Sequence, residues 1–113
     1  MNDVIERLRA SKAKAEEIDY EAGKIAGSQW AKTKAEYYEL LDFYQSVEKN
    51  GCPETVDDLM NAVNPDAEWT GDAKSGVNLL DEITRERRLP NRRYLRGFAE
   101  GIIAVWREIA PQL

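Results

Sequence analysis

The feature that most constrains this chain is its first 52 residues, which contain no proline and repeat apolar side chains at intervals of three and four. That interval returns a side chain to the same face of an α-helix. One such stripe consists of Val4, Leu8, Ala15, Ile18, Ala22 and Ile25. A second stripe consists of Tyr20, Gly23, Gly27, Trp30, Lys34, Tyr37, Leu41 and Tyr44. The pattern predicts helix over residues 3–49, from the capping-box spacing of Asp3 and Glu6 to a terminal cap at Gly51.

A continuous helix of that length would extend about 70 Å. A compact domain of about 100 residues has a radius of gyration of only about 13 Å. The helix therefore either breaks, within residues 11–15 or 23–27, or projects and packs against a second subunit. We favour a long helix within an oligomer.

The rest of the chain also has helical patterns. Pro53, Asp57 and Asp58 are typical of a helix start and predict a short helix over residues 54–63. Residues 64–76 are rich in loop formers, residues 77–88 have a helical apolar face, and Asn91 is a candidate N-cap for a helix over residues 92–109. No strand-like alternation occurs. We predict one all-α domain, a small bundle of about four helices.

The sequence Tyr-x-x-Gly-x-x-x-Gly occurs twice, from Tyr20 and from Tyr94. Glycine within a helix costs about 1 kcal/mol relative to alanine, so paired glycines need a structural reason. Gly23 and Gly27, like Gly97 and Gly101, remove side chains from one helix edge and allow another backbone to approach. We expect the two edges to pack on each other or on symmetry mates. The alternative is that they make room for a ligand, such as a nucleotide, beside Tyr20 or Trp30.

Aromatic side chains around the first helix favour a second packing partner, because one face cannot bury them all. Trp69 anchors the loop to the core or contacts a partner protein. The residues expected at interfaces are Tyr20, Gly23, Gly27, Trp30, Tyr37, Leu41, Tyr44, Gly97, Gly101 and Trp69.

Residues 85–96 carry six arginines and one glutamate. Arginine binds phosphate and carboxylate through its planar guanidinium group. The candidate anion or nucleic-acid residues are Arg85, Arg87, Arg88, Arg92, Arg93, Tyr94 and Arg96. The alternative, which we favour, is pairing with the acidic segment 36–82, whose net charge is −10.

Histidine is absent and Cys52 is the single cysteine. These counts exclude histidine-based catalysis, an internal disulfide and the usual zinc sites. Glu36, Glu39 and Asp42 lie three apart and could hold Mg²⁺ in an all-α hydrolase, but a solvated face is the preferred interpretation. A docking surface for a basic partner is a further alternative. We assign no catalytic residue, no metal ligand and no cofactor.

The sequence has neither an apolar run of the roughly 20 residues a membrane span needs nor a signal-like leader. We therefore expect a cytoplasmic protein without catalytic activity. It would act through protein–protein contacts, as a helical homo-oligomer and with another protein. An accessory, assembly or inhibitory protein of bacterial or phage type fits this description. The alternatives are nucleic-acid or nucleotide binding through residues 85–96 and a carboxylate–metal hydrolase.

Overall fold

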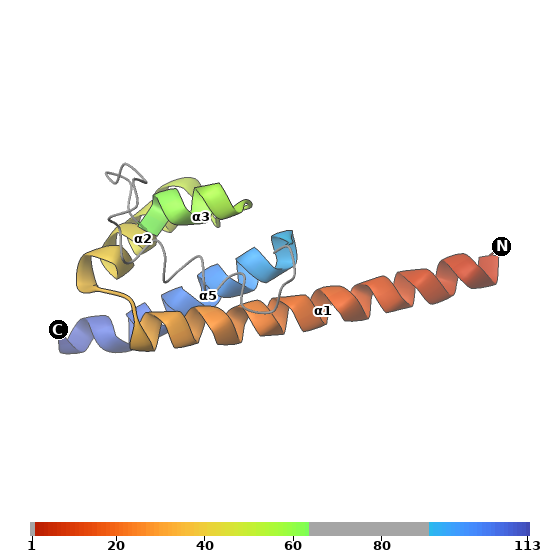
Figure 1. The fold of residues 1–113 in the computed structure, drawn as a ribbon, viewed down its shortest axis with the longest axis horizontal. Helices are drawn as coiled ribbons and strands as arrows, with labels where there is room; N and C mark the ends of the chain where they lie inside the picture. The colour runs from red at the N-terminus through yellow and green to blue at the C-terminus, as the bar shows by residue number, and fades with distance from the viewer. Residues whose placement is uncertain (1, 64–90) are drawn as a thin grey trace.

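The computed structural model describes residues 2–63 and 91–113, and Figure 1 shows their arrangement. These residues form four α-helices and no strand, which confirms the all-α fold class. The helices are α1 (Asn2–Thr33), α2 (Tyr37–Asn50), α3 (Val56–Val63) and α5 (Arg92–Ile109), followed by the short 3₁₀ helix η1 (Ala110–Gln112). The loop expected over residues 64–76 and the helix expected over residues 77–88 lie outside the described residues.

The sequence left open whether residues 3–49 form one long helix or a broken one. The chain breaks between Thr33 and Tyr37, so the favoured continuous helix is wrong. The backbone N–H groups of Lys34 and Ala35 both donate to the Trp30 carbonyl oxygen, which closes the last turn of α1. Glu36 is extended and forms a capping box with Glu39, whose Oε1 accepts from the Glu36 N–H at 2.8 Å. A second helix with its own cap therefore begins here, although the spacing of the second stripe continues across the break. Neither of the two expected break regions is broken.

The other helix ends follow local cap chemistry. Gly51 has a positive φ of 83°, and its N–H donates to the Val47 carbonyl oxygen, so the expected terminal cap is present. α3 begins two residues later than expected, and Thr55 Oγ1 accepts from the Asp58 N–H at 3.1 Å. α5 has the expected bounds, with Asn91 as its N-cap. By contrast, Asp3 lies inside the first turn of α1, because that helix already begins at Asn2.

The core forms where α1, α2, α3 and α5 meet, around α5, which contributes more buried side chains than any other described helix (Figure 1). Its largest fully buried side chains are Trp30, Phe43, Leu59, Val63, Leu95, Phe98 and Ile102. α1 and α5 run parallel and share the most extensive helix–helix contact. The first half of α1 extends beyond this core, and residues 2–15 are all exposed. The radius of gyration of 15.5 Å is accordingly larger than the ~13 Å of a compact chain of this length.

Candidate protein-interaction surface

The two glycine edges meet each other within one chain. A Cβ atom at Gly23 would overlap the carbonyl oxygen of Tyr94 and lie 2.9 Å from the carbonyl carbon. A Cβ atom at Gly27 would overlap the carbonyl oxygen of Phe98 in the same way. The missing side chains thus bring the two backbones into direct contact, as the spacing predicts.

The contact is reciprocal. A Cβ atom at Gly97 would overlap the carbonyl oxygen of Tyr20, and one at Gly101 would overlap the carbonyl oxygen of Lys24. The first tyrosine of each motif therefore faces the first glycine of the other motif, in two parallel helices. The repeated sequence is an approximately symmetric pair of contact faces. The glycines leave no space here for a ligand, because each one is filled by the opposite backbone.

The rest of the second stripe divides at the break after α1. Trp30 is fully buried in the core, and its ring lies 6.4 Å from that of Phe98, measured between centroids. Tyr37 and Tyr44 belong to α2 instead, where their rings lie 5.8 Å and 6.2 Å from that of Trp106. Leu41 packs partly buried against the core.

Trp106 joins these aromatics and was not among the expected interface residues. Its position on the apolar face of α5 could have indicated it. Trp69 lies outside the described residues.

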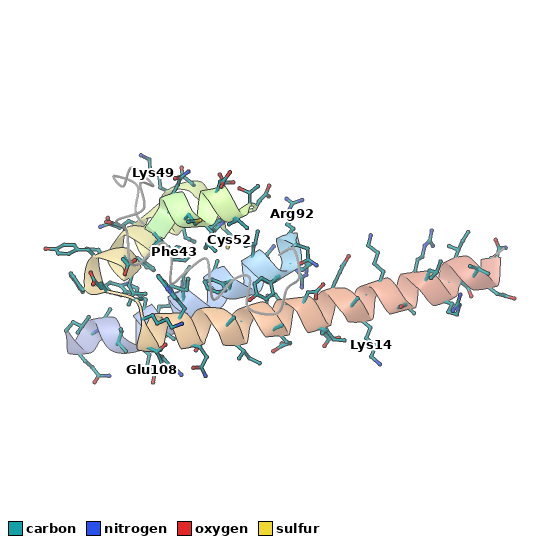
Figure 2. All side chains as sticks on the ribbon, in the orientation of Figure 1. Lys14, Phe43, Lys49, Cys52, Arg92 and Glu108 are labelled. Atoms are coloured by element: carbon teal, nitrogen blue, oxygen red, sulfur yellow. The ribbon has the colours of Figure 1, made fainter. Side chains whose placement is uncertain are left out.

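Each described arginine of the expected anion site has an acidic or aromatic neighbour. Arg92 forms an ion pair with Glu54, and the Arg96 Nε lies 3.6 Å from Glu100 Oε1. Figure 2 shows Arg92 at the start of α5. The guanidinium carbon of Arg93 lies 5.0 Å from the centre of the Tyr20 ring, within cation–π range.

Tyr94 is half-buried, with its ring 6.2 Å from that of Phe98. Arg85, Arg87 and Arg88 lie outside the described residues. The described part of the arginine segment is therefore built into intrachain contacts.

Tyr20 connects α1 to α5 by a polar contact beside the glycine edge. Its hydroxyl donates to Glu100 Oε2. This hydrogen bond to a carboxylate, together with burial, raises the pKa of Tyr20 above its ordinary value of 10.0. Asn91 adds a second connection, because its Nδ2 donates to Asp19 Oδ2 at 2.6 Å. Both contacts hold the first half of α5 against the middle of α1.

Glu36 and Glu39, two of the three carboxylates considered for Mg²⁺, form the N-terminal cap of α2. Glu39 is buried and its Oε1 caps α2, as described above. Across residues 2–63 and 91–113, no group of three or more cysteine, aspartate or glutamate side chains is placed to hold a metal ion.

Among residues 2–63 and 91–113, most of the exposed large aliphatic side chains lie along the first stripe of α1, which the sequence reasoning did not include among the interface residues. Exposed fractions are 53% for Leu8, 54% for Ile18 and 64% for Ile25. Val4 and Ile5 are exposed near the N-terminus of the same helix. We call the positions Val4, Leu8, Ser11, Ala15, Ile18, Ala22, Ile25 and Gln29 the α1 stripe.

A groove between α1 and α5 lies beside the C-terminal end of the α1 stripe. Ile25, Ser28 and Gln29 line it on the α1 side, and Gly101 and Ala104 line it on the α5 side. Gly101 has no side chain and Ala104 has a small one, so the two helices touch here and the groove between them is shallow. The stripe and the groove together form a continuous candidate surface.

None of the described helices combines the length and apolar character needed to cross a membrane. No protein-family model matches this chain, and no curated protein or solved structure matches it either.

Proposed function

We propose that this protein acts without catalysis, through protein–protein contacts, as a homo-oligomer assembled along the α1 stripe. The observation that carries the proposal is the exposure of Val4, Leu8, Ile18 and Ile25 on one face of a single helix. Burying a Val, Leu or Ile side chain stabilises by about 1.5–3 kcal/mol relative to leaving it exposed. A second helix on this face would recover that free energy.

The projecting half of α1 supports the same proposal. A helix gains most of its stability in proteins from packing an amphipathic face, and isolated helices shorter than about 12–15 residues are marginal in water. Residues 2–15 are exposed along their whole length, so the folded core does not supply this packing. A helical partner would supply it.

The non-catalytic part of the proposal rests on how the reactive groups are used. Tyr20 donates to Glu100, Arg92 pairs with Glu54, and Glu39 caps α2. The first contact joins α1 to α5, the second joins α5 to the segment before α3, and the third closes the start of α2. With no histidine in the sequence, the remaining acid–base chemistry is restricted to groups of this kind.

Light scattering on a size-exclusion column tests the proposal. We expect a mass above the 12.9 kDa of one chain at micromolar concentration, falling toward the monomer on dilution. Ile18→Glu places a charge in the middle of the stripe and should shift the protein to the monomer. Ala13→Glu is the matched control, because Ala13 is exposed on the opposite face of the same helix. A monomer at every concentration would contradict the proposal.

A further inference from the structure

The charges along α1 change sign near its middle. Residues 2–15 carry four basic and two acidic side chains, whereas residues 16–33 carry four acidic and two basic ones. Two such helices placed side by side in opposite directions bring each basic half against an acidic half. Two helices placed in the same direction bring like charges together over both halves. Charge therefore distinguishes the two orientations.

The charged residues that flank the α1 stripe also distinguish the antiparallel from the parallel orientation. The residues of the stripe are four and three positions apart, as in the seam of a coiled coil. This spacing identifies the residues that flank the seam on each side. On the basic half these include Lys12 and Lys14, and on the acidic half Asp19 and Glu21. Figure 2 shows Lys14 pointing away from α2, α3 and α5.

We infer that two copies of this chain pair antiparallel along the α1 stripe, with Ala15 of each copy opposite Ile18 of the other. The inference rests on the proposed function, because it specifies the partner and the geometry of that same surface. In this register Lys14 lies beside Glu21 of the second copy, and Lys12 lies beside Asp19 of the second copy. Each pair occurs twice through the two-fold axis.

Side-chain volumes at the two central layers favour the same register. Each of these layers joins a small Ala15 with a large Ile18, and further out Ser11 meets Ala22 and Leu8 meets Ile25 of the second copy. A parallel pair would instead place Ile18 against Ile18 and Ala15 against Ala15, so that wide and narrow layers alternate. Facing a large with a small side chain fills the space between helices more evenly.

The parallel arrangement is also weaker in its charges. In a parallel coiled coil a flanking residue faces the residue five positions later on the partner. Arg7 would then face Lys12 of the second copy, and Lys14 would face Asp19. One pair repels and one attracts, whereas both antiparallel pairs attract.

The groove between α1 and α5 fits this arrangement. Because Leu8 of the second copy lies opposite Ile25, the N-terminal end of the second α1 runs along the groove that Ile25, Ser28 and Ala104 line. The projecting half of each chain then packs on the folded core of the other. This covers the stripe face of the exposed residues 2–15 and the shallow edge of the glycine contact together.

Two of these charges already have intrachain contacts. Asp19 accepts from Asn91, and the Lys12 Nζ lies 3.8 Å from Glu16 Oε1. The pair of Lys14 with Glu21 therefore isolates the contact between chains best, and it is the pair chosen for the charge test.

Cysteine cross-linking tests the register directly. In a Cys52→Ser background, which removes the only cysteine, the Leu8→Cys and Ile25→Cys variants are prepared separately and mixed under mild oxidation. We expect a disulfide-linked dimer from the mixture that joins the two different variants, identified by mass spectrometry of the linked peptides. Each variant alone should form several-fold less, because its two cysteines would lie about 25 Å apart along the helix pair.

Two other outcomes would overturn the inference. Abundant Leu8→Cys dimers from that variant alone would show a parallel pair and overturn the inference while leaving the proposed function intact. A parent protein that remains monomeric would overturn both. Ala13→Cys mixed with Ile25→Cys is the matched control, and it should not cross-link because Ala13 lies on the opposite face.

A charge exchange gives an independent readout by sedimentation. Lys14→Glu should raise the dimer Kd roughly tenfold, because two attractive pairs become repulsive. Adding Glu21→Lys to the same chain should restore the Kd to within about threefold of the parent, because the exchanged pairs attract again. Only the antiparallel register joins these two positions. A double variant as weak as Lys14→Glu alone would overturn the register.

Discussion

The two stripes of α1 differ in a way that their composition does not suggest. The stripe that contains Gly23 and Gly27 is buried against α5. The α1 stripe, with Leu8, Ile18 and Ile25, is exposed. The less hydrophobic face is thus the one that packs within the chain.

Backbone geometry explains this inversion. The glycine face allows the backbones of α1 and α5 to touch, so their contact gains close-range dispersion over many atoms. Burying the aliphatic face requires a helix at ordinary separation, and none of the described helices lies there. A helix can therefore bury one face, here the glycine face, through shape complementarity. Its more hydrophobic face, here the α1 stripe, then remains available to another chain.

The largest expected effect on stability comes from placing a side chain in the glycine contact. Gly27→Leu should destabilise the fold by about 3 kcal/mol or more, because the new Cβ would collide with the backbone of Phe98 and force the helices apart. Urea unfolding measures the change. Ala13→Leu places the same side chain on the same face of α1 fourteen residues earlier, where the residue is exposed. We expect less than about 0.5 kcal/mol there. If Gly27→Leu unfolds like the parent protein, the description of the glycine contact is wrong.

Substituting one leucine in the folded core and one in the projecting half of α1 compares the packing of these two regions. Leu95→Ala removes a fully buried side chain and should cost about 2–5 kcal/mol. Leu8→Ala should change the stability of the monomer by less than about 0.5 kcal/mol, because Leu8 is 53% exposed. Both are measured by urea unfolding at a concentration where light scattering gives the monomer. Equal losses would show that Leu8 packs within its own chain.

Asn91 tests how firmly the start of α5 is held. Asn91→Ala removes the N-cap of α5, where the side-chain Oδ1 accepts from the Tyr94 N–H at 2.9 Å, and also removes the bond to Asp19. We expect a loss of about 1 kcal/mol, measured by thermal unfolding. Asn91→Ser keeps a cap acceptor without adding a charge beside Asp19, and should retain most of this stability. A loss in Asn91→Ser equal to that in Asn91→Ala would show that the bond to Asp19 dominates.

The smallest expected effect concerns the pH dependence of the contact between Tyr20 and Glu100. The pKa of Tyr20 is raised in the folded state, mainly by the hydrogen bond to Glu100. Its contribution to stability is therefore complete below the unfolded pKa of 10.0 and is lost as the pH rises through the higher folded value. The thermal midpoint, measured from neutral to alkaline pH, should therefore decrease as the pH rises above 10.0.

Tyr20→Phe is the control for that pH series. It should reduce the alkaline fall, and should cost at most about 1 kcal/mol at neutral pH, because the contact is partly solvated. The alkaline fall of the variant will not vanish, since the pKa of Tyr44 is also raised, mainly by its hydrogen bond to Glu48. An identical pH dependence in the variant and the parent would exclude Tyr20 as a contributor.

Local features of the fold could be predicted from the sequence. The bounds of α5, its cap at Asn91 and the cap at Gly51 all follow from short-range chemistry between neighbouring residues. The glycine edges were identified for the same reason, because the spacing alone places them on one face of each helix. The interruption after Thr33 was missed because Lys34 and Tyr37 continue the apolar spacing across it. The capping residues Glu36 and Glu39 were the available signal.

Short-range patterns in the sequence predict that the chain is helical, where several helices end, and which residues share a face. They do not predict which face is buried, that the glycine edges of α1 and α5 meet in parallel within one chain, or that Trp30 belongs to the core. The physical reason is that periodicity and capping depend on residues a few positions apart. Burial depends on which distant surfaces fit each other, and here backbone shape at four glycines outweighs the hydrophobicity of the α1 stripe.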